Sequence, residues 1–92
     1  IKSVACSTLG IDEFTINTAK KDERAVFARW LVWKYLRENT NLSLAKCGDL
    51  FKKDHATVKH GIKKVAPDEV KYMSKWQQIA YYSFQEKTKD LS

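Results

Sequence analysis

Residues 41–65 read NLSLAKCGDLFKKDHATVKHGIKKV, and they carry the clearest structural signals in the chain. Ser43 and Asp54 are both good N-caps, because a hydroxyl or carboxylate oxygen can accept hydrogen bonds from the free amides of a first helical turn. The negative charge of Asp54 also suits the positive end of a helix. The caps predict a short helix over about 44–51 and a second helix over about 55–65. Lys52 and Lys53 form a tight turn between them.

The second predicted helix has two different faces when its residues are placed at about 100° intervals. One face is apolar and small, and it holds Val58, Gly61, Ile62 and Val65. The opposite face is polar and basic, and it holds Ala56, Lys59, His60, Lys63 and Lys64. Gly61 on the apolar face would let another helix approach closely. Two capped helices with this division predict a helix-turn-helix, in which the second helix enters the DNA major groove by its N-terminal residues.

The sequence before this stretch predicts more helix. A first helix is expected from about Lys2 to Leu9, where Gly10 ends it, and residues 11–17 form a short turn of helix or an irregular link. Residues 18–22 are a polar loop. A long helix then runs from about Glu23 to Glu38, because apolar residues recur there at steps of three and four. Its predicted buried stripe is Val26, Phe27, Trp30, Leu31 and Tyr35.

After the stretch, Pro67 opens a last helix that is expected to run to about Lys87, since proline is favoured in a first helical turn. Its apolar face is expected to pack into the core and comprises Val70, Met73, Trp76, Ile79, Ala80 and Phe84. No alternating runs of Val, Ile and Thr suggest strands. The fold class is therefore all-α. We expect one domain over residues 1–92, a small helical bundle with a helix-turn-helix and an added C-terminal helix.

The composition limits the classes of partner and compartment but does not identify the function. The 17 Lys and Arg residues exceed the 11 Asp and Glu residues, for a net charge of +6, which attracts polyanions of any kind. Cys6 and Cys47 lie among apolar residues, which favours two buried thiols in a reducing compartment. No apolar run has transmembrane length and no signal peptide is visible, so a cytoplasmic protein without membrane contact is expected. The chain begins at Ile1, as a piece of a longer protein would.

The run DHATVKH at 54–60 resembles the signature that opens the recognition helix of the DnaA box-binding domain, the C-terminal domain of bacterial replication initiators. The flanks agree in order, from Thr40 and Asn41 through Gly48, Asp49 and Phe51. The resemblance covers about residues 1–66 and is sharpest at 40–65. It implies a Trp-repressor-like helix-turn-helix that binds double-stranded DNA at DnaA-box-like sites in replication initiation or its regulation. It also implies a neighbouring ATPase domain outside this chain.

The family's roles carry over to matching residues. Base contacts are expected from Asp54, His55, Ala56 and Thr57. Contacts to the DNA backbone are expected from Lys21, Arg29, Arg37, Ser43, Lys59, His60 and Lys63. The loop before the long helix departs from the family. The family has an arginine-rich loop there, and one of its arginines enters the minor groove, whereas this chain has TAKKDER at 18–24. Lys21 is the nearest match, and lysine enters that groove less well than arginine.

Other functions fit the residues less well. His55 and His60 are five apart, so they do not share a helical face as a zinc pair four apart would. No nucleophile motif, phosphate loop or paired carboxylates are visible, so no enzyme, cofactor or small-molecule substrate is expected. Two alternatives stay open. One is a related transcriptional repressor that binds a palindromic site as a dimer. The other is a protein-interaction module that uses the last helix, with Tyr81 and Tyr82.

Overall fold

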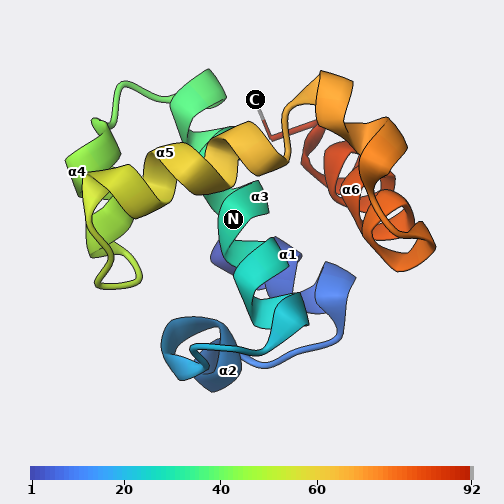
Figure 1. Ribbon diagram of the computed structural model, residues 1–92, viewed down its shortest axis with the longest axis horizontal. Coiled ribbons are helices and arrows are strands. Elements are labelled where there is room, and N and C mark those ends of the chain that lie inside the picture. Colours follow the sequence, from blue (N-terminus) through green and yellow to red (C-terminus); the bar gives the residue numbers. More distant parts are fainter. Residues whose placement is uncertain (92) are drawn as a thin grey trace.

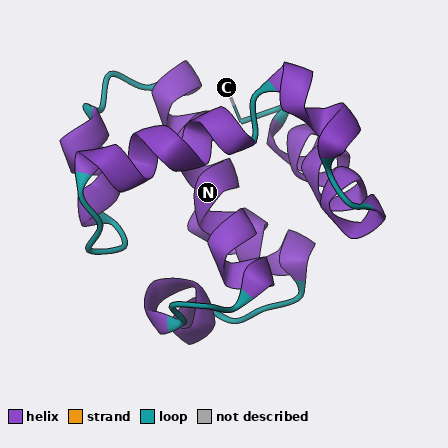
Figure 2. Ribbon diagram, in the orientation of Figure 1, coloured by secondary structure: helices purple, strands orange, loops and turns teal. Residues whose placement is uncertain are grey.

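The computed structural model describes residues 1–91, and these form helices and connecting loops without a strand (Figures 1 and 2). The order is α1 (Lys2–Leu9), α2 (Glu13–Thr18), α3 (Glu23–Asn39), α4 (Leu44–Asp49), α5 (His55–Lys64), the 3-10 helix η1 (Pro67–Tyr72) and α6 (Lys75–Thr88). The all-α fold with a helix-turn-helix is as predicted. None of these helices combines the length and the apolar character that a membrane crossing requires.

The long helix α3 is the centre of the fold. It packs against α1, α2, α4, α5 and α6, and α5 crosses in front of it in Figure 1. Because neighbours contact it on several sides, eight of its 17 residues are buried, and they extend beyond one stripe. The buried residues are Ala25, Phe27, Ala28, Arg29, Leu31, Val32, Trp33 and Leu36. Of the predicted stripe, Phe27 and Leu31 are buried, while Val26, Trp30 and Tyr35 are half-buried.

Local sequence signals set most helix ends. Gly10 ends α1 with φ 68°, a left-handed conformation that glycine adopts without strain. Asp12 and Asp22 cap α2 and α3 by accepting hydrogen bonds from backbone amides of the first turn. Cys6 and Cys47 are free and buried, as expected from their apolar neighbours. Burial raises the pKa of both thiols.

The C-terminal segment corrects the prediction of one continuous helix from Pro67. The chain leaves helical geometry at Met73, where ψ is 151°, and α6 starts afresh after Ser74. Ser74 and Gln77 form a capping box, in which the Gln77 side chain accepts from the Ser74 amide at 2.9 Å. Ile79 is 61% exposed instead of packed in the core, because around α6 it lies about 100° from Ala80 and about 140° from Phe84, which are buried. Val70, Ala80 and Phe84 are buried as predicted.

Candidate nucleic-acid interface

The turn between α4 and α5 is held by the backbone around Gly48. The Gly48 carbonyl accepts from the amides of Phe51 at 3.0 Å and Lys53 at 2.9 Å. Lys52 has φ 57°, so the chain reverses through a left-handed residue. A Cβ on residue 48 would run into the carbonyl oxygen of Lys53 and lie 3.2 Å from Cγ2 of Val58. The tight turn therefore requires glycine at position 48.

Two side-chain caps orient the helices that this turn joins. Ser43 Oγ accepts from the Lys46 amide at 3.1 Å, and Asp54 Oδ1 accepts from the Thr57 amide at 2.8 Å. Both caps are as predicted. Hydrogen bonds from the side chain and then the backbone of Thr57 hold the pKa of Asp54 below its ordinary value. Asp54 is thus ionised at neutral pH, at the positive end of α5.

The inner face of α5 is locked onto α3. Val58, Gly61 and Val65 are buried there, which confirms the predicted apolar face. At Gly61 the helices approach so closely that a Cβ would lie 2.8 Å from Nε1 of Trp30 and 3.0 Å from Cε3 of Trp33. Trp33 also donates its indole N–H to the Cys47 carbonyl at 2.9 Å. Since Trp33 is fully buried, this bond fixes α4 against α3 as well.

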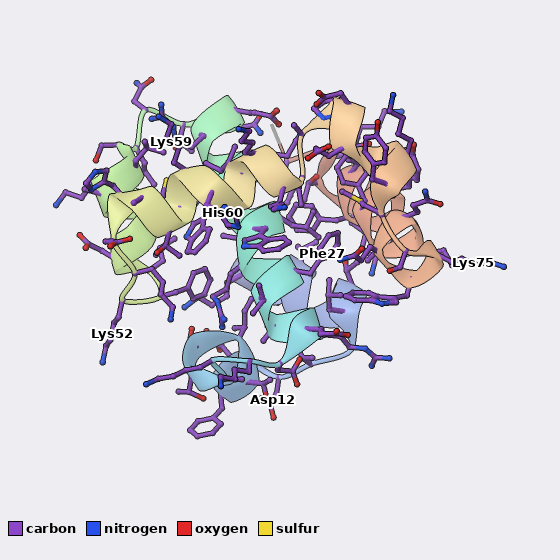
Figure 3. The ribbon with its side chains drawn as sticks, in the orientation of Figure 1. Asp12, Phe27, Lys52, Lys59, His60 and Lys75 are labelled. Atoms are coloured by element: carbon purple, nitrogen blue, oxygen red, sulfur yellow. The ribbon has the colours of Figure 1, made fainter. Side chains whose placement is uncertain are left out.

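The outer face of α5 is open to solvent and basic. Its exposed side chains are Asp54, His55, Ala56, Thr57, Lys59, His60, Lys63 and Lys64. Residues 52–64 hold five lysines and one acidic residue, which is a stronger positive excess than that of the whole chain. Figure 3 shows Lys59 and His60 on α5, and Lys52 extending from the turn beside it. The face therefore combines positive charge with hydrogen-bonding groups at a helix N-terminus.

Two predicted residues come from other elements. Lys21, in the loop before α3, is exposed and lines a cleft of about 440 Å³ together with Trp30 and Trp76. Trp30 also meets the His60 ring edge-on, with 6.3 Å between ring centroids. Trp30 therefore borders both the cleft that Lys21 lines and the His60 side chain of α5. Arg37 is exposed at the end of α3, where its Nη1 donates to the Leu42 carbonyl at 2.7 Å and steadies the loop before Ser43.

Arg29 differs from the expectation that it contacts DNA. Its side chain is 4% exposed, and Nη1 donates to the Ile16 carbonyl at 2.8 Å. Burial lowers the pKa of its guanidinium, which nevertheless stays charged. This bond ties α2 to α3 inside the protein, so the guanidinium does not face a phosphate. The basic side chain alone could not reveal this, because the carbonyl that holds it belongs to Ile16, 13 residues earlier on the preceding helix α2.

The residues expected from the sequence to contact DNA leave out two exposed lysines of this surface. Lys52 lies at the exposed tip of the turn, and Lys64 lies exposed at the end of α5. The helical wheel already places Lys64 on the basic face, whereas the left-handed turn that projects Lys52 is visible only in three dimensions. Among residues 1–91, no group of three or more His, Cys, Asp and Glu side chains is arranged to hold a metal ion.

A short capped helix, a tight turn and a second capped helix with an exposed basic face define a helix-turn-helix protein, a class that uses the second helix to read DNA. Residues 1–65 match the family model described as the bacterial dnaA protein helix-turn-helix. The chain belongs to this family. The resemblance that DHATVKH indicated is therefore confirmed, with nearly the extent expected from the sequence.

Two relatives are chromosomal replication initiator proteins DnaA. The protein of Herpetosiphon aurantiacus is 38% identical over 60 residues, which is 64% of this chain and 13% of the relative. The protein of a Synechococcus strain is 37% identical over 67 residues, which is 72% of this chain and 14% of the relative. The chain thus corresponds to a small part of each relative's length.

Proposed function

We propose that this chain binds double-stranded DNA in a sequence-specific manner, at DnaA-box-like sites, with α5 in the major groove. One observation carries the proposal: α5 is fixed to α3 by its inner face, while its outer face presents exposed basic and polar side chains. A rigid helix with an open face is what groove recognition requires, since side chains that are already positioned lose little freedom on binding. The family membership supports the same interpretation.

In this proposal the residues of the first turn of α5 and its N-cap contact the DNA bases. His55 can donate to a guanine N7 or a thymine O4, and Ala56 offers its methyl group to a thymine methyl. Asp54 has a second oxygen beyond the one that accepts from Thr57, and that oxygen can accept from a cytosine amine. Thr57 is exposed beside them, and its hydroxyl can exchange its hydrogen bond to Asp54 for one to a base or a nearby phosphate. Asp54 therefore both caps the helix and selects bases.

Phosphate contacts surround this centre. The proposed residues are Lys21, Arg37, Ser43, Lys59, His60 and Lys63, to which the exposed Lys52 and Lys64 are added. Such contacts supply affinity and register, and each one strengthens the dependence of binding on salt. Lys21 is the residue that would approach the adjacent minor groove, because Trp30 lies between its loop and α5.

The cellular role follows from the relatives. Since they are replication initiator proteins, we propose that this chain attaches an initiator to its origin, or acts at the same sites to regulate initiation. In the first case an ATPase domain would be joined to it. Both roles place the protein in the cytoplasm, with the DNA.

Fluorescence anisotropy with a DnaA-box duplex and a scrambled duplex, at two salt concentrations, tests the proposal. We expect clear preference for the box and affinity that falls steeply with salt. His55→Ala should cost about 1–3 kcal/mol on the box and little on the scrambled duplex. Lys63→Ala is the matched control on the same exposed face, and it should weaken both duplexes alike and lower the salt slope by about one. Equal wild-type binding to both duplexes would refute box recognition, and no binding would refute DNA binding.

A further inference from the structure

The outward face of α6 carries a stripe that the proposed DNA interface does not use. Lys75, Ile79, Tyr82 and Glu86 follow one another at steps of four, three and four, so they lie within about 60° on the helix. All four are exposed, with Ile79 at 61% and Tyr82 at 58%. The opposite face is buried against the rest of the protein through Ala80, Tyr81, Phe84 and Thr88. Figure 3 shows Lys75 pointing away from the molecule.

The stripe is complementary to itself when a second α6 runs antiparallel to it. Lys75 and Glu86 are equally far from the middle of the stripe, and so are Ile79 and Tyr82. A two-fold axis at the middle therefore sets Ile79 opposite Tyr82 of the second copy. The same axis sets Lys75 opposite Glu86 of the second copy, twice per pair. Isologous contacts of this kind are the commonest way in which two identical chains associate.

The position of these two charges within α6 also favours the antiparallel pair. Lys75 is its first residue, no acidic residue lies in its first turn, and Glu86 lies near its C-terminus, next to Lys87. Both charges oppose the dipole of their own helix, which favours anions at the N-terminus and cations at the C-terminus. In an antiparallel pair each charge lies beside the opposite end of the second α6. The arrangement that is unfavourable within one chain becomes favourable between two.

We propose that the stripe Lys75–Ile79–Tyr82–Glu86 is an interface between two copies of this chain, paired antiparallel through α6. The occupant is a second copy because apolar residues face apolar residues and each charge faces its opposite. A single pair of helices of about 21 Å buries less than the roughly 1,200 Å² typical of stable complexes, so association is weak. The net charge of +6 on each copy also opposes association. This pairing does not depend on DNA binding.

Sedimentation equilibrium of the whole chain, from about 10 µM to about 1 mM, tests the pairing over the concentrations at which a weak dimer dissociates. We expect a reversible monomer–dimer equilibrium. Lys75→Glu and Glu86→Lys each place like charges opposite one another twice, so each should weaken dimerisation about tenfold. The double variant exchanges the two charges and should return the dissociation constant to within about threefold of the wild type. Ile79→Glu should give a monomer.

Lys63→Glu changes the net charge of the chain as Lys75→Glu does, but on α5, and it should leave the dimer in place. Circular dichroism of each variant establishes that these exposed substitutions leave the fold intact. A wild-type chain that is monomeric throughout the range would overturn the proposal. So would single charge variants that dimerise normally, or a double variant that stays as weak as the singles, because the pairing of Lys75 with Glu86 would then be absent.

Discussion

Gly48→Ala tests the geometry on which the helix-turn-helix depends. Position 48 lies in α4, where alanine is favoured over glycine by about 1 kcal/mol on propensity alone. The structure predicts the opposite result, because the new Cβ would collide with the Lys53 carbonyl oxygen and lie 3.1 Å from the carbonyl carbon. Those atoms are backbone, and the Lys53 amide donates to Gly48 at 2.9 Å, so the collision is relieved only by opening the turn.

The magnitude follows from these opposing contributions. Overpacking costs about 1–3 kcal/mol, and loss of the Lys53–Gly48 hydrogen bond adds about 1 kcal/mol. After the gain in propensity we expect the free energy of unfolding to fall by about 1–3 kcal/mol, measured by urea denaturation followed by circular dichroism. Ala45→Gly, at an exposed site of the same helix, is the control and should lose about 1 kcal/mol from propensity. A Gly48→Ala variant more stable than the wild type would refute the steric argument.

Three further substitutions test other parts of the fold. Arg29→Met should lower the free energy of unfolding by about 1–3 kcal/mol in urea denaturation, because the Ile16 carbonyl loses its donor. The salt dependence of DNA binding should stay unchanged, and a smaller dependence would indicate that Arg29 contacts DNA after all. Phe84→Ala should cost about 3–5 kcal/mol whereas Ile79→Ala stays within about 0.5 kcal/mol, and equal losses would contradict the register of α6. Because the pKa of Asp54 is lowered in the folded protein, its charge stabilises the fold above the ordinary carboxyl range, and this contribution is lost as pH falls through the lowered pKa. Asp54→Asn keeps a cap without the titration, so its acid unfolding, monitored by circular dichroism, should depend less on pH than that of the wild type. Identical unfolding curves would count against the effect.

The parts of the fold that local chemistry controls are predictable from sequence. Ser43 and Asp54 cap their helices because each oxygen lies next to amides only three residues away. The two faces of α5 follow from helical periodicity within ten residues. Gly61 on the apolar face indicates a close approach, and the structure supplies Trp30 and Trp33 as the partners. In each case the signal lies in residues that are close in sequence or on one helix.

The errors arise where distant segments meet. The predicted buried stripe of α3 is too narrow because helices on several sides cover it, and a single helical wheel cannot register that. The assignment of Arg29 to the DNA backbone fails because nothing near it in sequence indicates the Ile16 carbonyl that holds it. The break at Met73, by contrast, has a local signal. Ser74 and Gln77 have the spacing of a capping box, but the apolar residues on both sides suggest one continuous stripe.

The proposed DNA site can be predicted from the sequence only in part, because some of its residues share one helical turn and others come from separate elements. Residues 54–57 can be named because they form one helical turn, and all four are exposed. The link between Lys21 and α5 through Trp30 cannot be derived from spacing, since Trp30 lies between them on a third element. The tip position of Lys52 depends on one left-handed residue in the turn. Contacts within one helix are therefore easier to predict than a surface assembled from three elements.

The division of α5 into a locked face and an open face has an evolutionary consequence. Its anchoring side chains, Val58 and Val65, are distinct from the exposed ones, so on the proposed interface mutations at His55, Ala56 or Thr57 would change the target sequence at little cost to folding. Such a helix could acquire new target sites without passing through unfolded intermediates. Asp54 is the exception, because a change there would alter capping and the proposed recognition together, and lineages that diverge in target should retain it longest.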